Sequence, residues 1–125
     1  ILPEAQFVLD HIAKPRIAAG QMQPWRALIE ELALRDNVVC KLSGMITEAS
    51  WTSWSVDDLR PYTDVVLNAF GPDRLMFGSD WPVCLLAGQY AEVVNAADAL
   101  TSDLSEDERE MIFAGTAMRV YDLEI

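Results

Sequence analysis

The sequence predicts an α/β fold with parallel strands, because three short apolar runs alternate with helical patterns. The runs cover residues 7–9, 38–40 and 75–77, and each passes directly into polar residues. Runs this short and apolar are typical of strands that are buried on both faces of a sheet. Their alternation with helices indicates right-handed crossovers and therefore a parallel arrangement.

Helical patterns fill the intervals between these runs and the whole of the last third. Pro24 suits the first turn of the first helix, and Ser55 is a typical N-cap for the second, with Gly71 and Pro72 ending it. Ser105 with Glu108 three residues later is a capping-box pattern. The expected helices cover residues 24–34, 55–70, 89–100, a segment after Ser105, and 117–121.

The strand ends recur after about 30 to 40 residues, which is the length of one βα unit. Three parallel strands bury little surface by themselves, and the apolar outer edges of such a sheet need partners. A doubly wound domain remains an alternative, but three of the eight units of a (β/α)₈ barrel fit the pattern better.

Composition excludes several classes of function. The 125 residues suffice for one modest domain, and 51% of them are hydrophobic, as in globular proteins. A net charge of −11 with scattered basic residues argues against a nucleic-acid partner. No apolar run approaches the roughly 20 residues that cross a bilayer, so no membrane partner is expected. We expect the chain, which begins at Ile1 and shows no signal-peptide pattern, to be part of a longer protein.

The two cysteines lie far apart in the sequence, at Cys40 and Cys84, and do not form a Cys-x-x-Cys motif. Both have apolar neighbours. Buried thiols in a reducing cytoplasm are the expected state, and the predicted location is cytoplasmic.

Polar residues at the strand ends are the candidates for chemistry, because parallel α/β proteins carry their sites at the carboxyl ends of strands. His11 is the sole histidine; a lone histidine is more often structural, but its strand-end position favours a site role. Asp80 could be a turn-forming residue ahead of Pro82, yet a carboxylate at the end of a buried strand must be desolvated, paired or used. His11 and Asp80 are therefore the expected catalytic pair.

Three further residues lie near these strand ends. Lys14 could hold an anionic substrate group or be a solvated loop residue, and Ser43 could contact substrate or simply form a turn. Asp10 is expected to face away from His11, since neighbouring residues on a strand point to opposite faces. His11 and Asp80 could also be metal ligands, but a catalytic zinc usually needs three protein ligands, so they would supply only part of a metal site.

Three segments resemble the amidohydrolase-2 family, in particular its sugar-lactone and pyrone-dicarboxylate lactonases, also described as TIM-barrel metal-dependent hydrolases. The segments occur in the family's order and spacing, and the tail from Gly115 to Tyr121 resembles the family's final helix, with Thr116 where asparagine is common. They are FVLDHIAKP (7–15), KLSG (41–44) and RLMFGSDWP (74–82).

The resemblance implies that residues 1–125 are the C-terminal part of a single barrel domain, with strands six, seven and eight. His11 would match the histidine of strand six. Asp80 would match the aspartate of strand eight that acts as general base or metal ligand. The family's His-x-His on strand one and its strand-five histidine have no counterpart in this chain.

The activity that the resemblance implies is hydrolysis of a lactone, a small-molecule substrate, by water that Asp80 activates. The cofactor remains open between a divalent metal such as zinc and none, and so does a homo-oligomeric state. Two alternatives remain: a zinc-dependent decarboxylase of the same family, and a non-catalytic α/β fragment that needs the missing half-barrel. The fragment alone is expected to be inactive.

Overall fold

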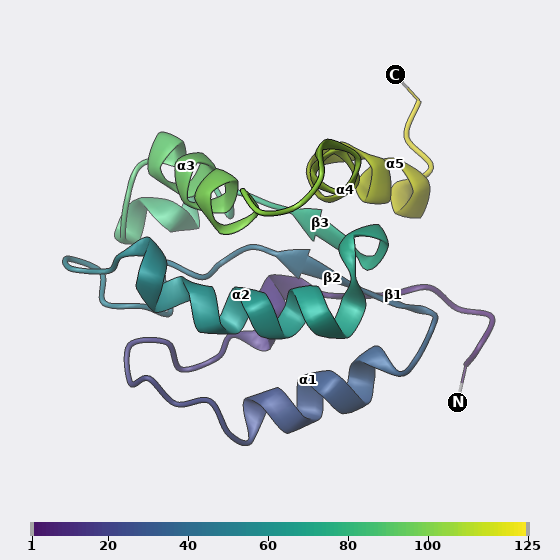
Figure 1. Ribbon diagram of the computed structural model, residues 1–125, viewed down its shortest axis with the longest axis horizontal. Helices are drawn as coiled ribbons and strands as arrows, with labels where there is room; N and C mark the ends of the chain where they lie inside the picture. The colour runs from purple at the N-terminus through teal and green to yellow at the C-terminus, as the bar shows by residue number, and fades with distance from the viewer. Residues whose placement is uncertain (1, 125) are drawn as a thin grey trace.

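The computed structural model describes residues 2–124 and shows an α/β fold around a three-stranded parallel sheet. The strand order is β1-β2-β3, and all three strands run in the same direction, toward the left in Figure 1. Their carboxyl ends therefore meet at one edge. The strands are β1 (Phe7–Leu9), β2 (Val38–Leu42) and β3 (Leu75–Phe77).

Five α-helices follow the predicted order, and short 3₁₀ or π segments join several elements. The α-helices are α1 (Trp25–Ala33), α2 (Val56–Phe70), α3 (Tyr90–Leu100), α4 (Glu106–Glu110) and α5 (Thr116–Tyr121). The 3₁₀ segments are Asp10–Ala13, Pro72–Arg74 and Val83–Leu86, and a π-helical segment covers Met111–Gly115.

Local sequence explains most helix boundaries. Ser105 with Glu108 forms the predicted capping box, and Ser55, predicted as an N-cap, forms a capping box with Asp58; both satisfy backbone N–H groups in the first turn. Gly71 ends α2 with φ +77°, a value that glycine adopts without steric strain. The second strand is two residues longer than the apolar run 38–40, so Lys41 belongs to the strand rather than to the loop after it.

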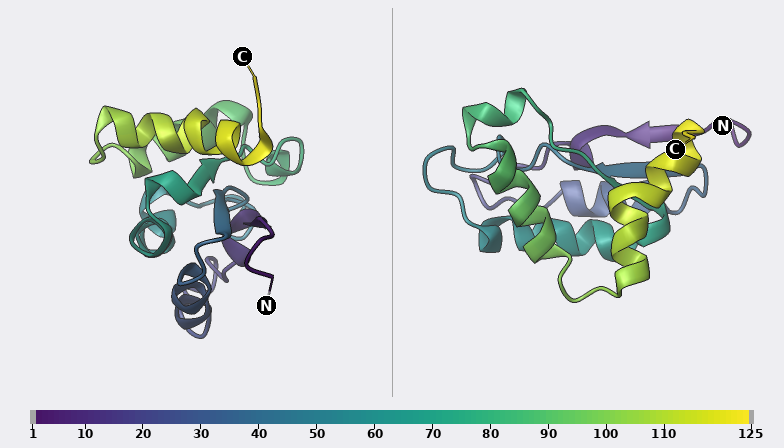
Figure 2. Two further views of the ribbon diagram at one scale, coloured as in Figure 1. Left: turned by 90° about the vertical axis from the view of Figure 1, so that its right-hand side faces the viewer. Right: turned by 90° about the horizontal axis from the view of Figure 1, so that it is seen from above.

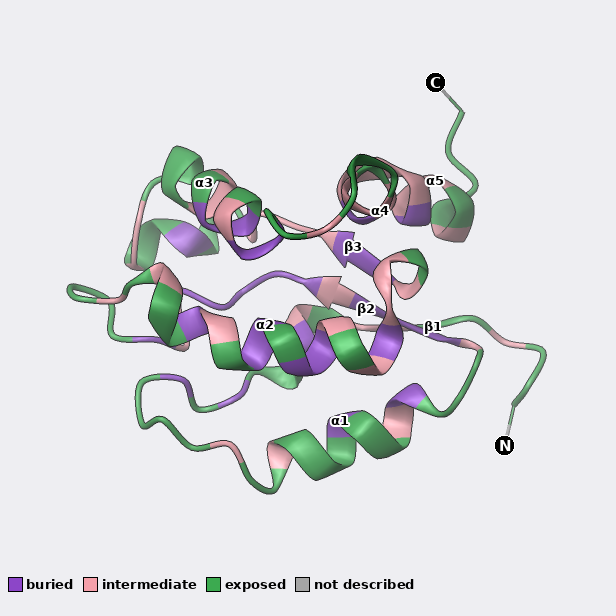
Figure 3. Ribbon diagram, in the orientation of Figure 1, coloured by how far each residue is buried: buried purple, intermediate pink, exposed green. Residues whose placement is uncertain are grey.

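Helices α3, α4 and α5 lie beyond β3, and helices α1 and α2 lie against one side of the sheet, as the end-on view in Figure 2 shows. Alternate residues of β2 face them: Val38, Cys40 and Leu42 join the hydrophobic cluster. β2, most of β3 and the inner face of α2 are buried, whereas β1 is only partly buried and the outer face of α1 is exposed (Figure 3). Lys41 and Ser43 occupy the opposite face by strand alternation.

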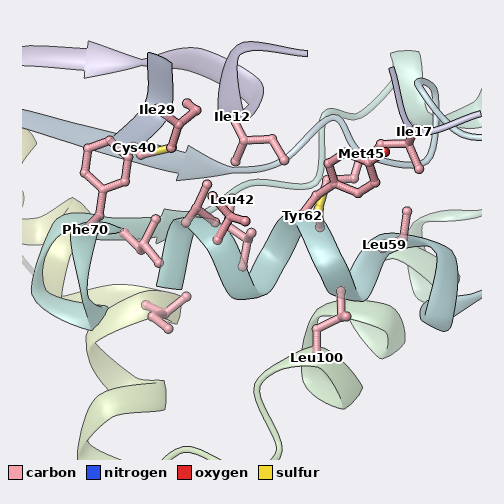
Figure 4. Packing of buried hydrophobic residues seen from close by; sticks show 14 of the residues in the cluster. Ile12, Ile17, Ile29, Cys40, Leu42, Met45, Leu59, Tyr62, Phe70 and Leu100 are labelled. Atoms are coloured by element: carbon pink, nitrogen blue, oxygen red, sulfur yellow. The ribbon is translucent and has the colours of Figure 1, made fainter. Parts of the chain in front are cut away.

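The close view in Figure 4 shows how the core reaches the carboxyl edge of the sheet. Ile12, which directly follows His11, is fully buried beside Leu42, and Tyr62 of α2 packs near Met45 in the loop after β2. The turn after β1 is thus anchored by its own hydrophobic residue. Among residues 2–124, no helix is both long and apolar enough to span a membrane.

Candidate functional site

The turn after β1 holds His11 in an unusual backbone conformation. Four consecutive residues, 11–14, have positive φ angles, between 45° and 60°. Left-handed backbone costs about 1–2 kcal/mol per non-glycine residue, and the β-branched Ile12 is especially unsuited to it. Trp25 stabilises the turn, since its Nε1 donates a hydrogen bond to the carbonyl oxygen of Ile12 at 2.7 Å.

The imidazole of His11 is contacted at both ring nitrogens. Nδ1 lies 2.7 Å from Oγ of Ser43, and Nε2 lies 3.3 Å from carboxylate oxygens of both Asp80 and Asp10. Carboxylates accept hydrogen bonds only, so Nε2 carries a proton, and in the neutral ring Nδ1 then accepts from the Ser43 hydroxyl. The tautomer is fixed by these partners.

Asp80 combines burial with an unused acceptor. Its side chain is only 11% exposed, and its Oδ1 faces His11. Its Oδ2 is buried and has no hydrogen-bond partner among the described residues. Buried carboxylate oxygens are costly to leave unpaired, which marks this atom as one suited to a bound group.

A small cavity of about 20 Å³ lies beside Asp80. Its lining includes Ser43 and Ser79 together with apolar residues of α2 and α3. This volume is sufficient for one water molecule. The arrangement of a histidine N–H, a buried carboxylate and a water-sized space is suited to proton abstraction from water.

Gly44 is required by the position of the His11 ring. Its φ is +65°, and a Cβ atom there would lie 2.7–2.9 Å from Cγ, Cβ and Nδ1 of His11. No side chain fits in that space. Gly44 and Ser43, both in the KLSG segment, therefore place the imidazole from two sides.

Asp10 does not face away from His11, and that expectation was wrong. Its carboxylate contacts Nε2 of His11 at 3.3 Å and Nζ of Lys41 at 3.0 Å. Strand alternation fails here because β1 ends at Leu9 and the left-handed turn begins at His11. The hydrogen bond from Lys41 is the main cause that lowers the pKa of Asp10 below its usual value.

The structure thus brings His11, Asp80 and Ser43 together. Lys14, which is 55% exposed, instead pairs with Glu48 at 3.2 Å. In residues 2–124 no hydrogen bond or ion pair joins Lys14 to His11, Ser43 or Asp80. Lys41 is the residue that sequence reasoning missed, and its position in the KLSG segment, beyond the apolar run of β2, was the available signal.

Cys40 and Cys84 are both free and buried, as expected for structural thiols. Burial raises the pKa of Cys40 to about 12 and also raises the pKa of Cys84, with the charge of Asp80 adding to the second effect. Thiolate is the nucleophilic form of cysteine, so neither residue is a candidate nucleophile.

The donor types at the site are those that zinc binds, namely an imidazole nitrogen and carboxylate oxygens. Residues 2–124 nevertheless contain no group of three or more His, Cys, Asp or Glu side chains that could hold a metal ion. A catalytic zinc generally has three protein ligands. The described residues alone therefore do not make a complete zinc site.

The proteins to which the chain is similar include a curated relative and two solved structures. It is 48% identical to an L-fucono-1,5-lactonase of Burkholderia multivorans, over 94% of this chain and 43% of the relative. A solved amidohydrolase from the same species, with bound zinc, matches with a TM-score of 0.88 and 48% identity, over 96% of this chain and 45% of that one.

A putative 2-pyrone-4,6-dicarboxylic acid hydrolase from Pseudomonas putida matches with a TM-score of 0.76 and 27% identity, over 96% of this chain and 44% of that one. The chain spans less than half the length of the relatives that it matches. The amidohydrolase family model matches residues 2–123. The chain therefore belongs to the amidohydrolase family.

Proposed function

We propose that this chain supplies strands six to eight of a (β/α)₈-barrel enzyme that hydrolyses a lactone, with Asp80 as the general base. The single observation that carries the proposal is the buried, unpaired Oδ2 of Asp80 beside the proton-bearing Nε2 of His11. Both residues lie at the carboxyl ends of parallel strands, where barrel enzymes carry their sites.

The unpaired edges of the sheet support the barrel. Within residues 2–124, β1 pairs only with β2, and β3 also pairs only with β2. Beside β1 lies an apolar hollow of about 490 Å³, lined by Leu2, Phe7 and Leu32 among others. An open parallel sheet with apolar flanks needs further strands to cover it, and the preceding part of a barrel would provide them.

In the proposed reaction, a water molecule attacks the lactone carbonyl while Asp80 takes its proton. Asp80 then gives the proton to the ring oxygen of the lactone as the bond between that oxygen and the carbonyl carbon breaks. The product is a hydroxy acid. General-base catalysis of this kind contributes about 10²–10⁴-fold to the rate. His11 orients the Asp80 carboxylate through its single Nε2–H in the free enzyme, and it directs that N–H to the carbonyl oxygen when substrate is bound.

The substrate class follows from the relatives, whose names describe lactonases of a sugar acid and of a pyrone dicarboxylate. A zinc ion, as in the related amidohydrolase structure, would take His11 and Asp80 as ligands from this chain and would polarise the carbonyl. Proton transfer to Oδ2 of Asp80 does not depend on that ion. A ring nitrogen that binds zinc carries no hydrogen, so the ion would replace the N–H of His11 in polarising the carbonyl. We also propose, from composition, that the enzyme acts in the cytoplasm.

The test uses the full-length protein that contains this chain, assayed by acid release from a panel of sugar lactones. Asp80→Asn should lower kcat by about 10²–10⁴-fold with an unchanged melting temperature, because the amide cannot take a proton. Asp64→Asn, at an exposed position on α2, is the control and should retain activity. Lactonase activity retained in Asp80→Asn would contradict the proposal.

Two alternatives make different predictions. A decarboxylase would release CO₂ from an acidic aromatic substrate, and a likeness to a 2,6-dihydroxybenzoate decarboxylase at 17% identity shows the fold alone. A non-catalytic module, whose open strand edges another chain covers, would elute as an assembly rather than as a monomer in size-exclusion chromatography, and no form of it would hydrolyse a lactone. Lactone turnover that requires the longer protein would exclude both.

A further inference from the structure

Lys41 places a positive charge inside the candidate site. It is the fourth residue of β2, and its side chain is only 30% exposed. Its strand neighbours Cys40 and Leu42 belong to the core on the helix side. Lys41 therefore lies on the opposite face, the one that also carries Ser43.

A continuous chain of contacts runs from Lys41 to His11. Nζ of Lys41 lies 3.0 Å from Oδ1 of Asp10, and Oδ2 of the same carboxylate lies 3.3 Å from Nε2 of His11. One carboxylate thus uses its two oxygens on two different partners. Because Asp10 is exposed, its side chain would have several orientations without a partner that restrains it.

Gly78 of the GSDWP segment leaves room for this arrangement. A Cβ atom at Gly78 would lie 3.5 Å from Cε of Lys41 and 3.1 Å from Cβ of Ser43. The contact with Lys41 would be an ordinary van der Waals contact, whereas the contact with Ser43 would be tight, so the absence of a side chain after β3 makes room chiefly for Ser43. Two glycines, Gly44 and Gly78, therefore flank the groups that contact the imidazole.

We propose that Lys41 and Asp10 are positioning residues for His11. Lys41 restrains Asp10, Asp10 restrains Nε2, and Ser43 restrains Nδ1, so that the ring is fixed at both nitrogens. This inference rests on the proposed function for its effect on catalysis. Misplacement of a catalytic group by about 1 Å can cost on the order of 10²-fold in rate, so the effect of the pair is on kcat.

The kinetic test compares Lys41→Met, Asp10→Asn and the double variant in the full-length protein. Each single variant should lower kcat by about 10- to 100-fold while KM changes by less than about threefold. The double variant should be no worse than the poorer single variant, since both substitutions break the same chain of contacts. Lys41→Arg should restore part of kcat. Arg26→Met, which breaks an exposed ion pair on α1, is the control.

A raised KM with unchanged kcat, or additive losses in the double variant, would overturn the proposal, because Lys41 would then contact the substrate directly. A second readout does not depend on activity. In protein labelled with ¹⁵N-histidine, with His11 assigned by His11→Gln, the Nε2 resonance should shift in Lys41→Met and not in Arg26→Met. An unchanged resonance refutes positioning even in an active enzyme, and a shifted resonance in a protein without lactonase activity refutes only the proposed function.

Discussion

At the amino ends of β2 and β3, one guanidinium group donates hydrogen bonds to backbone carbonyl groups of several segments. At the carboxyl ends of the strands, by contrast, the backbone has strained φ angles. Arg74, directly before β3, donates to the carbonyl oxygens of Ala33, Arg35, Val38 and Ala69, at 2.9–3.4 Å. At the other end, residues 11–14 and Asp80 have left-handed φ angles, and Oδ2 of Asp80 is unpaired.

The two ends of the sheet contribute differently: the amino ends stabilise the fold, and the carboxyl ends carry the candidate site. At the amino ends, each hydrogen bond that Arg74 donates pairs a backbone carbonyl oxygen, and this pairing stabilises the fold. At the carboxyl end, strain and an unpaired acceptor persist because the surrounding core fixes them, as is common at functional sites. Substitutions at the two ends should therefore change different measurements.

The largest effect is expected for Gly44→Ala in the full-length enzyme. The new Cβ would overlap the His11 ring, so kcat should fall by at least about 10²-fold. Gly20→Ala is a matched control, because Gly20 has a similar φ of +62° but has no neighbouring atom within 4 Å of its Cβ position. Both variants should lose about 1 kcal/mol from the strained backbone, and Gly44→Ala should lose more because its Cβ also overlaps the His11 ring. Equal activities of the two variants would contradict the role assigned to Gly44.

Arg74→Met should have the opposite profile. It removes hydrogen bonds to four carbonyl groups, so the free energy of unfolding should fall by about 2–4 kcal/mol in urea denaturation. Activity per folded molecule should not change. Arg60→Met, which removes only a long exposed contact with Asp57, should cost less than about 0.5 kcal/mol. If fully folded Arg74→Met protein had a much lower kcat, the amino ends would also affect catalysis, which would contradict the proposed difference between the two ends of the sheet.

Trp25→Phe tests the anchor of the strained turn. The variant loses the hydrogen bond to the Ile12 carbonyl, with an expected cost of about 1–2 kcal/mol and a lower kcat because His11 shifts. Trp51→Phe also loses one indole hydrogen bond, to Thr47, but at an exposed position away from that turn. If the two variants have equal kcat, the turn does not depend on Trp25.

The smallest effect concerns pH. Lys41 lowers the pKa of Asp10 below the usual 3.8, so the pair stabilises the fold above that value and loses its contribution as pH falls through the lowered pKa. Relative to Asp10→Asn, the unvaried protein should be more stable by less than about 1 kcal/mol at pH 7, since Asp10 is exposed. The difference should disappear once the pH has fallen below the lowered pKa of Asp10; a difference that grows on acidification would contradict the ion pair.

The sequence predicted the strands, the helices and the meeting of His11 with Asp80, because hydrophobic period and strand-end position depend on local pattern. It did not predict the left-handed turn at residues 11–14, which depends on tertiary contacts such as the burial of Ile12 and the hydrogen bond from Trp25 to its carbonyl oxygen. The wrong orientation of Asp10 follows from that turn. The sequence could not decide whether Lys14 or Lys41 lies at the site. Lys41 lies there because β2 extends to Leu42, and that length depends on pairing with β3.

The most direct test of the account is a crystal structure of the full-length Asp80→Asn protein with a sugar lactone bound. The account predicts that the lactone lies at the carboxyl ends of β1 and β3, with its carbonyl group against His11 and residue 80. A lactone bound elsewhere, for example in the hollow beside Phe7, with no contact to either residue, would contradict it.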